Sequence, residues 1–294
     1  CSNTGIHLGG SSYYLSDTVF ASNLILGTGV AGIQVMGFAF PGIEVRGNTI
    51  TPAKGNGMVI GTGGVRISDN RIAAGAENGI RLVSGLLGLA LTSIVVSGNR
   101  LQSLQGNGIT IETRLVSAKI EHNVLNAITG NGLLMLPGSL AGSVSVLANE
   151  FTNIATAAAG TTRGGEFAAI HLRNVFAAAV SDNTISGVGH DASNAAVVAG
   201  IRADTNIDLR VSDNTIVNIA PTTDFSNPAA GILVVMPIGH TAIADNLIRR
   251  QIAPNDDNSP WQAIRILGIA SESAGKLQGE SFNKLTAEGQ VNTV

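Results

Sequence analysis

Two short segments in the second half of the chain carry histidine, arginine and aspartate side chains at alternating positions. His171 and Arg173 are two residues apart, and so are Arg202 and Asp204. If both segments are extended strands, each pair lies on one face. A carboxylate, a histidine and two arginines on one surface could bind an acidic sugar and move a proton. The same residues could instead form an exposed ladder of ion pairs, each stabilising by less than ~1 kcal/mol.

The segments that must position these side chains belong to a repeated motif. Its pattern is a small residue, an apolar residue, any residue and another apolar residue. The copies lie at residues 5–8, 32–35, 57–60, 79–82, 108–111, 132–135, 169–172, 200–203, 231–234 and 263–266. A Gly-Asn-Gly or Glu-Asn-Gly tripeptide, typical of turns, precedes several of them (55–57, 77–79, 106–108 and 130–132). Alternation with a period of two over such short segments predicts strands, and no window shows sustained helical periodicity.

Aligning the copies predicts which outward side chains are neighbours. His171 and Arg202 fall in one outward column. Arg173 and Asp204 fall in the next column, which Glu112 joins two copies earlier. We therefore predict that His171 lies beside Arg202 and that Arg173 lies beside Asp204.

A second motif consists of an apolar residue, two small or polar residues, Asn, any residue and an apolar residue. Residues 180–185 and 211–216 are almost identical copies. The asparagines are Asn23, Asn48, Asn70, Asn99, Asn123, Asn149, Asn183, Asn214 and Asn246. We expect each asparagine at a sharp corner between a second and a third strand, because asparagine tolerates left-handed backbone. We also expect amide hydrogen bonds from repeat to repeat, worth ~1 kcal/mol each.

Three short strands per unit, in one unit after another, resemble the repeat of the right-handed parallel β-helix. This is the fold of pectate lyases, polygalacturonases, mannuronan epimerases and many phage tailspikes. The predicted fold class is all-β, a right-handed single-stranded parallel β-helix of about ten coils over residues 1–270. Residues 271–294 are polar and lose the repeat, which predicts a C-terminal cap, a degenerate coil or a tail. No capping segment precedes Cys1, so we expect a fragment of a longer protein.

The outward face of the first strand is unusually apolar. It carries Val83, Leu134, Leu136, Leu233, Val235 and Leu267 where solvent is expected. Such a patch predicts a cover, either a loop, a ligand or another copy of the chain in a homo-oligomer. The longer repeats place extended turns at about 152–165, 186–197, 217–229 and 249–260, beside this face. The β-helix resemblance implies that a substrate groove could lie along such a wall.

Composition restricts the partners. The net charge is −3 with no basic run, which indicates neither nucleic acid nor an anionic membrane as a partner. No stretch approaches ~18 uninterrupted apolar residues, so no membrane span is expected. No metal or other cofactor is predicted, although Asp256 and Asp257 in an oxygen-rich turn could hold Ca²⁺. Trp261, the one tryptophan, could stack on a sugar or anchor its loop.

Two functions follow from these patterns. The favoured one is a non-catalytic, rigid β-helix module of a larger extracellular or particle-associated protein, such as a tail fibre, spike or surface protein. It would bind carbohydrate or partner chains. The alternative is a polysaccharide lyase, glycoside hydrolase or epimerase with Glu112, His171 and Asp204 as catalytic candidates, and Arg173 and Arg202 as ligands for substrate. The Asp-Pro-His motif of the alginate epimerases and the clustered aspartates of the polygalacturonases are missing.

Overall fold

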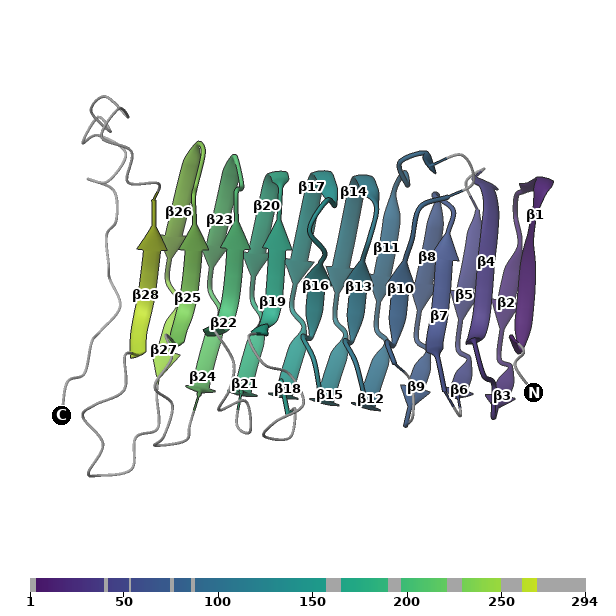
Figure 1. The fold of residues 1–294 in the computed structure, drawn as a ribbon, viewed down its shortest axis with the longest axis horizontal. Coiled ribbons are helices and arrows are strands. Elements are labelled where there is room, and N and C mark those ends of the chain that lie inside the picture. The colour runs from purple at the N-terminus through teal and green to yellow at the C-terminus, as the bar shows by residue number, and fades with distance from the viewer. Residues whose placement is uncertain are drawn as a thin grey trace.

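The computed structural model describes most of the chain as three parallel β-sheets (Figure 1). The described residues are 4–39, 42–52, 54–74, 77–85, 88–156, 165–189, 197–220, 229–249 and 261–268. Successive strands along the chain enter the first, second and third sheet in turn, so each coil contributes one strand to each sheet. We number the coils 1 to 10 after the strands of the first sheet.

The first sheet contains β1 (Ile6–Leu15), β4 (Ala31–Ala39), β7 (Asn56–Gly61), β10 (Ile80–Leu82), β13 (Ile109–Ile111), β16 (Leu133–Met135), β19 (Glu166–Arg173), β22 (Val197–Asp204), β25 (Ala229–Val235) and β28 (Trp261–Leu267). The second sheet contains β2 (Val19–Ala21), β5 (Ile43–Arg46), β8 (Val65–Ser68), β11 (Ile94–Ser97), β14 (Arg114–Glu121), β17 (Leu140–Leu147), β20 (Val175–Ser181), β23 (Asp208–Ser212) and β26 (His240–Ala244). The third sheet contains β3 (Leu24–Leu26), β6 (Thr49–Thr51), β9 (Arg71–Ala73), β12 (Arg100–Leu104), β15 (Val124–Ile128), β18 (Glu150–Ile154), β21 (Thr184–Val188), β24 (Thr215–Ile219) and β27 (Leu247–Arg249).

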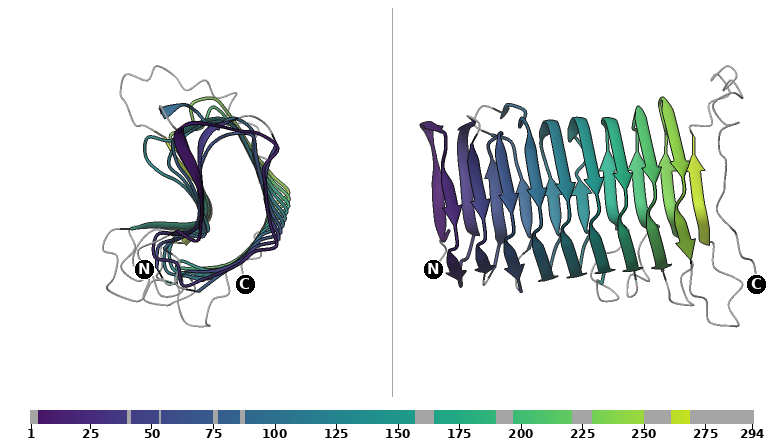
Figure 2. Two further views of the ribbon diagram at one scale, coloured as in Figure 1. Left: turned by 90° about the vertical axis from the view of Figure 1, so that its right-hand side faces the viewer. Right: turned by 180° about the vertical axis from the view of Figure 1, so that it is seen from behind.

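This arrangement confirms the predicted parallel β-helix. Seen end-on, the coils superpose on one closed outline (Figure 2). The ten strands of the first sheet match the predicted ten coils, and the described residues complete nine of them with strands in the other two sheets. Within those residues, no helix has the length and apolarity that a membrane span requires.

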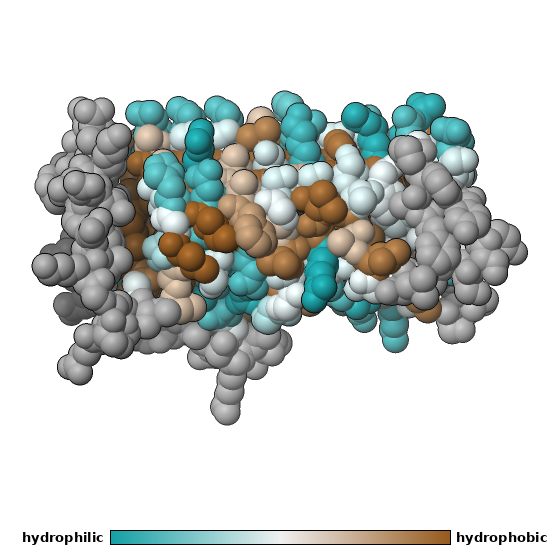
Figure 3. All heavy atoms as spheres, turned by 90° about the horizontal axis from the view of Figure 1, so that it is seen from above, coloured by the Kyte–Doolittle hydropathy of each residue, from teal (hydrophilic) through white to brown (hydrophobic). Residues whose placement is uncertain are grey.

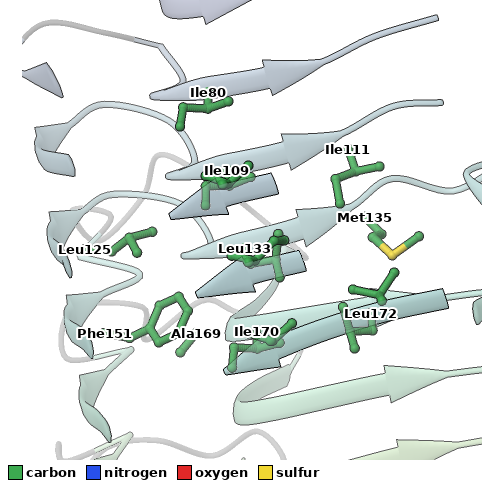
Figure 4. Packing of buried hydrophobic residues seen from close by; sticks show 14 of the residues in the cluster. Ile80, Ile109, Ile111, Leu125, Leu133, Met135, Phe151, Ala169, Ile170 and Leu172 are labelled. Carbon is green, nitrogen blue, oxygen red and sulfur yellow. The ribbon is translucent and has the colours of Figure 1, made fainter. Parts of the chain in front are cut away.

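The core consists of stacked apolar columns inside the coil. Ile80, Ile109, Leu133 and Ile170 occupy one register position of four successive coils, and all four are fully buried (Figure 4). Each such side chain is worth about 1.5–3 kcal/mol when removed from water. Because inward and outward positions alternate, this core fixes the outward direction of His171, which lies between buried Ile170 and Leu172.

The prediction that each asparagine adopts the left-handed backbone at the corner between the second and third sheets is wrong. In all nine coils the residue with positive φ is the one before the asparagine, and the asparagine itself is not left-handed. These residues are Ser22, Gly47, Asp69, Gly98, His122, Ala148, Asp182, Asp213 and Asp245. The left-handed turn is therefore made by a neighbour that points to solvent, and it leaves the asparagine side chain directed inward.

The asparagine ladder itself is confirmed. Each asparagine from Asn23 to Asn214 donates its backbone N–H and its side-chain amide to the Oδ1 atom of the next asparagine, at 2.8–3.1 Å. Most of the side-chain amides also donate to a strand carbonyl one coil back. The seven interior members, Asn48 to Asn214, are at most 2 % exposed. These bonds satisfy backbone groups that the corner would otherwise leave buried and unpaired.

A second, shorter set of asparagines was not predicted to form a ladder. Asn56, Asn78, Asn107 and Asn131 come from the tripeptides that the sequence assigns to turns. They too bond from coil to coil, at 2.8–3.5 Å. The last of them accepts a bond from the backbone N–H of Ala168 at 2.6 Å, which ties the ladder to β19.

Candidate functional site

The strand register brings together the side chains that the sequence singled out. Strands β19 and β22 are neighbours in the first sheet, with His171 opposite Arg202 and Arg173 opposite Asp204. Both predicted pairs of neighbours, each within one outward column, are confirmed. A fifth residue, Glu166 at the start of β19, joins the group. We call these five residues the ion cluster.

Asp204 is the centre of the ion cluster. Its Oδ2 atom lies 2.9 Å from His171 Nε2 and 3.2 Å from Arg173 Nε. Arg202 Nε donates to both carboxylate oxygens, at 2.8 and 3.1 Å. Both oxygens of this carboxylate are therefore occupied by donors from within the protein.

Glu166 closes the network on its other side. One of its oxygens accepts a bond from Arg173 Nη2 at 2.6 Å, and the other lies 3.0 Å from Arg202 Nη2. Two guanidinium groups thus alternate with two carboxylates. Their charges cancel, so a neutral His171 leaves the ion cluster with no net charge to attract an ionic ligand.

Burial distinguishes this network from the exposed ladder that was the sequence-based alternative. His171 is 0 % exposed, and the side chains of Arg202 and Asp204 are 9 % and 12 % exposed. Glu166 is the most accessible member at 37 %. An exposed ladder is therefore wrong for these coils, because the outward side chains cover one another instead of pointing into solvent.

The proton positions follow from the pKa directions. Burial lowers the pKa of His171, because it penalises the imidazolium more than Asp204 favours it. Burial alone would raise the pKa of Asp204, but hydrogen bonds from His171 and Arg202 outweigh it and lower the pKa to about 2. The pair is thus a neutral imidazole beside a carboxylate.

This protonation state assigns the hydrogen bonds of the imidazole. The Nε2–H group of His171 donates to Asp204, so Arg173 Nε, 3.0 Å from the same nitrogen, directs its proton to the carboxylate instead. The Nδ1 atom of His171 is buried without a hydrogen-bond partner in the described part of the chain. A histidine held in this way orients its neighbours more readily than it exchanges protons with a substrate.

A metal ion suits this donor set poorly. Ligand atoms of Glu166, His171 and Asp204 lie within 4.8 Å of one another. The oxygens that would bind a cation, however, already accept bonds from Arg173 and Arg202. A cation would have to displace two guanidinium groups and would then lie beside their positive charge. The geometry favours an ion-pair network over a metal centre.

Comparison with known families agrees with the repeat and the three sheets. A family model described as the right handed beta helix region matches residues 1–151, just over half of the 294 residues. The chain belongs to this family. No curated protein matches it. The family match ends before Glu166, so the ion cluster of this β-helix lies in coils outside the matched region.

Glu112 does not join the ion cluster. It lies in coil 5 of the β-helix, and its carboxylate makes a paired contact with Arg81 of coil 4, at 2.7 and 2.8 Å. This bond raises the pKa of the Arg81 guanidinium. Arg81 lies one coil before Glu112 in the first sheet, and the sequence did not identify it as a partner.

The remaining candidates lie apart from the ion cluster. Trp261 begins β28 of the β-helix in coil 10, opposite Ala229 and half-buried, three coils beyond His171. Asp256 and Asp257, the candidates for Ca²⁺, fall outside the described residues. So do residues 271–294 and most of the long turns predicted to form a wall.

The buried imidazole predicts a pH-dependent stability. The unfolded chain takes up a proton on His171 below pH ~6.5, whereas the folded chain, in which burial lowers the pKa of His171, takes it up only at a lower pH. Stability should therefore fall as the pH is lowered through this value. The contribution of Asp204 is complete above its unfolded pKa of ~3.9 and is lost as the pH falls from there to its folded pKa of about 2. We expect the urea midpoint to fall between pH about 7.5 and about 5. His171→Gln should flatten this fall, and His240→Gln, at a side chain 65 % exposed, should leave it unchanged. If the urea midpoint depended equally on pH in the wild type and in His171→Gln, the assignment of a neutral, buried imidazole to His171 would be contradicted.

Proposed function

We propose that this β-helix is a non-catalytic, rigid module of a larger extracellular or particle-associated protein, such as a tail fibre, spike or surface protein. In that role it binds carbohydrate or partner chains along its length. The observation that carries the proposal is that the charged groups of the ion cluster bond to one another and leave no free group for a substrate. A general acid or base must come within hydrogen-bond reach of its substrate, and His171 is fully buried with Asp204 bonded on both oxygens.

The structure of the coil stack supports a role as a spacer. The first sheet continues through ten strands without a break in order. At ~4.8 Å per coil, ten coils extend roughly 45 Å. The asparagine ladder runs through coils 1 to 9 and joins each corner to the next, which resists bending and shear at the corners. Such a scaffold holds whatever it carries at a fixed distance and orientation.

Turnover is the first test. Incubation with a panel of neutral and acidic polysaccharides, followed by assays for reducing ends and unsaturated products, is expected to give no product above that of His171→Gln. Binding to the same panel on a glycan array measures the other part of the proposal independently. Product formation that is lost in His171→Gln but kept in Glu112→Gln would overturn the non-catalytic role. It would favour the alternative of a lyase, hydrolase or epimerase acting along the first sheet.

A further inference from the structure

The outward face of the first sheet is not the open apolar surface that the sequence predicts. Leu134 and Leu233 are only 9 % and 3 % exposed, and every residue of β7, β13 and β16 is buried. Exposed hydrophobic side chains lie among hydrophilic ones on the face that Figure 3 shows, at the corner between the first and second sheets. These strands of the first sheet are therefore enclosed on both faces, and the polar groups at their starts need partners within the protein.

The polar groups at these starts belong to the second ladder, which consists of Asn56, Asn78, Asn107 and Asn131. Each of these asparagines precedes a glycine, and Asn-Gly occurs four times in the sequence, at residues 56–57, 78–79, 107–108 and 131–132. Each copy lies at or just before the first-sheet strand of its coil, in coils 3 to 6. Asparagine is a thermolabile residue, and it reacts fastest before glycine, because glycine has no Cβ to hinder attack by its backbone nitrogen. The most reactive asparagine dipeptide thus recurs in four consecutive coils.

Packing requires both residues of each dipeptide. The asparagine makes the bonds from coil to coil, at 2.8–3.5 Å. A Cβ atom added to any of the four glycines would lie 2.5–2.6 Å from a backbone oxygen of the next coil, and a methyl group at that distance overlaps it. A less reactive dipeptide does not fit, so the fold itself must control the reaction.

The reaction is an attack by the glycine backbone nitrogen on Cγ of the preceding asparagine side chain. A bond from this nitrogen to Cγ forms, the bond from Cγ to Nδ2 breaks, and the glycine N–H proton leaves with Nδ2 as ammonia. Water then opens the cyclic imide at either carbonyl. Opening at one carbonyl gives aspartate, and opening at the other gives isoaspartate, whose main chain is lengthened by the Cβ carbon. The attack needs a free glycine N–H group and a side chain that can turn toward it.

The folded coils hold both reacting groups. The N–H groups of Gly57, Gly79 and Gly108 donate to the backbone oxygen of the next ladder asparagine, at 2.8–3.0 Å. The N–H group of Gly132 donates to the backbone oxygen of Ala168 at 3.2 Å. The Oδ1 atom of every asparagine in the second ladder also accepts a bond from the next coil. Deamidation at any of the four sites therefore requires a local opening in which the next coil detaches.

Asn78 shows which bonds the reaction would destroy. Its Oδ1 atom accepts bonds from the backbone N–H and the side-chain amide of Asn107, at 3.2 and 3.1 Å, and from the hydroxyl of Thr110 at 3.1 Å. Its Nδ2 atom donates to Asn56 at 2.9 Å. Aspartate in place of Asn78 has no N–H group for Asn56, and it places a negative charge in a largely buried ladder. Isoaspartate also shifts the register of the coil, so neither product restores the ladder.

We propose that the second ladder is a latent self-modification site. Opening of coils 3 to 6 releases the four Asn-Gly dipeptides to deamidate, and the products prevent these coils from closing again. The lifetime of the folded β-helix then depends on how rarely these coils open. This property is independent of any carbohydrate or partner chain, so it goes beyond the proposed function.

Peptide mapping by mass spectrometry tests whether opening controls the reaction. The wild type is held at mildly alkaline pH, either folded in buffer or unfolded in guanidinium chloride, and conversion is followed at each asparagine. We expect the four sites to react at least ~10-fold more slowly in the folded chain. Asn183 precedes threonine and is the control, which should react slowly in both states. Equal rates at the four sites in the two states, or fast reaction at Asn183 in the unfolded chain, would overturn the proposal.

Thr110→Val tests the ladder bonds separately from the stability of the whole fold. It removes the hydroxyl donor to Asn78 and leaves the bond from the Ala168 N–H group to Asn131 in place. In the folded variant we expect deamidation to be about 5-fold faster at Asn78 and unchanged at Asn131. Thr110→Ser keeps the hydroxyl and should keep the wild-type rate. An unchanged rate at Asn78 in Thr110→Val, or an equal rise at Asn131, would contradict control by the ladder.

Refolding tests the fate of the product. Samples are diluted from guanidinium chloride after increasing times, and circular dichroism measures the fraction of the wild type that refolds. This fraction is expected to fall in step with deamidation at the four sites. A fully deamidated chain that refolds to the wild-type thermal midpoint would show that the products still allow the coils to close, and the proposal would be wrong.

Discussion

Replacing Asn123 by alanine is expected to lower the free energy of unfolding by about 3–5 kcal/mol. Asn123 is 0 % exposed, and its side chain makes five hydrogen bonds. It donates to the carbonyls of Val96 and Glu121 and to Asn149, and it accepts two bonds from Asn99. Alanine leaves the backbone N–H of Asn99 buried without its acceptor, and each such group costs ~1–3 kcal/mol. The change in free energy is measured by urea unfolding at equilibrium, where the unfolding and refolding curves coincide.

The same substitution at the end of the ladder is its control. Asn23 is half-buried, and its side chain makes one ladder bond, to Asn48. Asn23→Ala should cost no more than about 1 kcal/mol, because solvent can replace the lost contact. If Asn23→Ala and Asn123→Ala had equal effects, the ladder would act through the asparagine backbone conformation and not through its side-chain bonds.

The fold could be predicted because the same sequence pattern recurs in every coil. The period-two alternation identifies the strands and the side of each strand that faces the core, and the regularly spaced asparagines give the number of coils. The reason for the asparagine could not be predicted in the same way. Sequence places Asp182 and Asn183 side by side, and either residue type tolerates positive φ. Only the backbone shows that Asp182 makes the turn and that Asn183 is selected for its amide bonds.

The sequence predicts only those contacts of the ion cluster that the strand register fixes. Aligning the repeats places His171 beside Arg202, and the strands pair in that way. Glu166 was missed because it lies five residues before His171, outside the motif, and reaches the cluster through its long side chain. Glu112 was included because it shares a column with Asp204, but a column does not specify which neighbour a flexible side chain selects. Burial depends on such choices, so the closed state of the network could not be predicted.

Asp204→Ala is expected to be the most damaging change in the ion cluster, with a loss of about 3–5 kcal/mol. Removing one partner from a buried ion pair leaves the other charge uncompensated. Here it would leave Arg202, 9 % exposed, with Glu166 alone and would leave His171 without its acceptor. Asp204→Asn keeps the size of the side chain and part of its bonding, so we expect an intermediate loss. Urea midpoints at neutral pH compare the stability of the wild type, Asp204→Ala and Asp204→Asn.

Glu112→Ala is the matched control, because Glu112 also pairs with an arginine across neighbouring coils. Its partner Arg81 has a side chain 38 % exposed, so solvent screens the pair, and we expect a loss below ~1 kcal/mol. A large difference between Asp204→Ala and Glu112→Ala requires a desolvated network whose groups are held for structure. Equal, small losses would mean that the ion cluster opens readily to solvent. In that case His171 and Asp204 could reach a bound sugar, and the non-catalytic role would lose its main support.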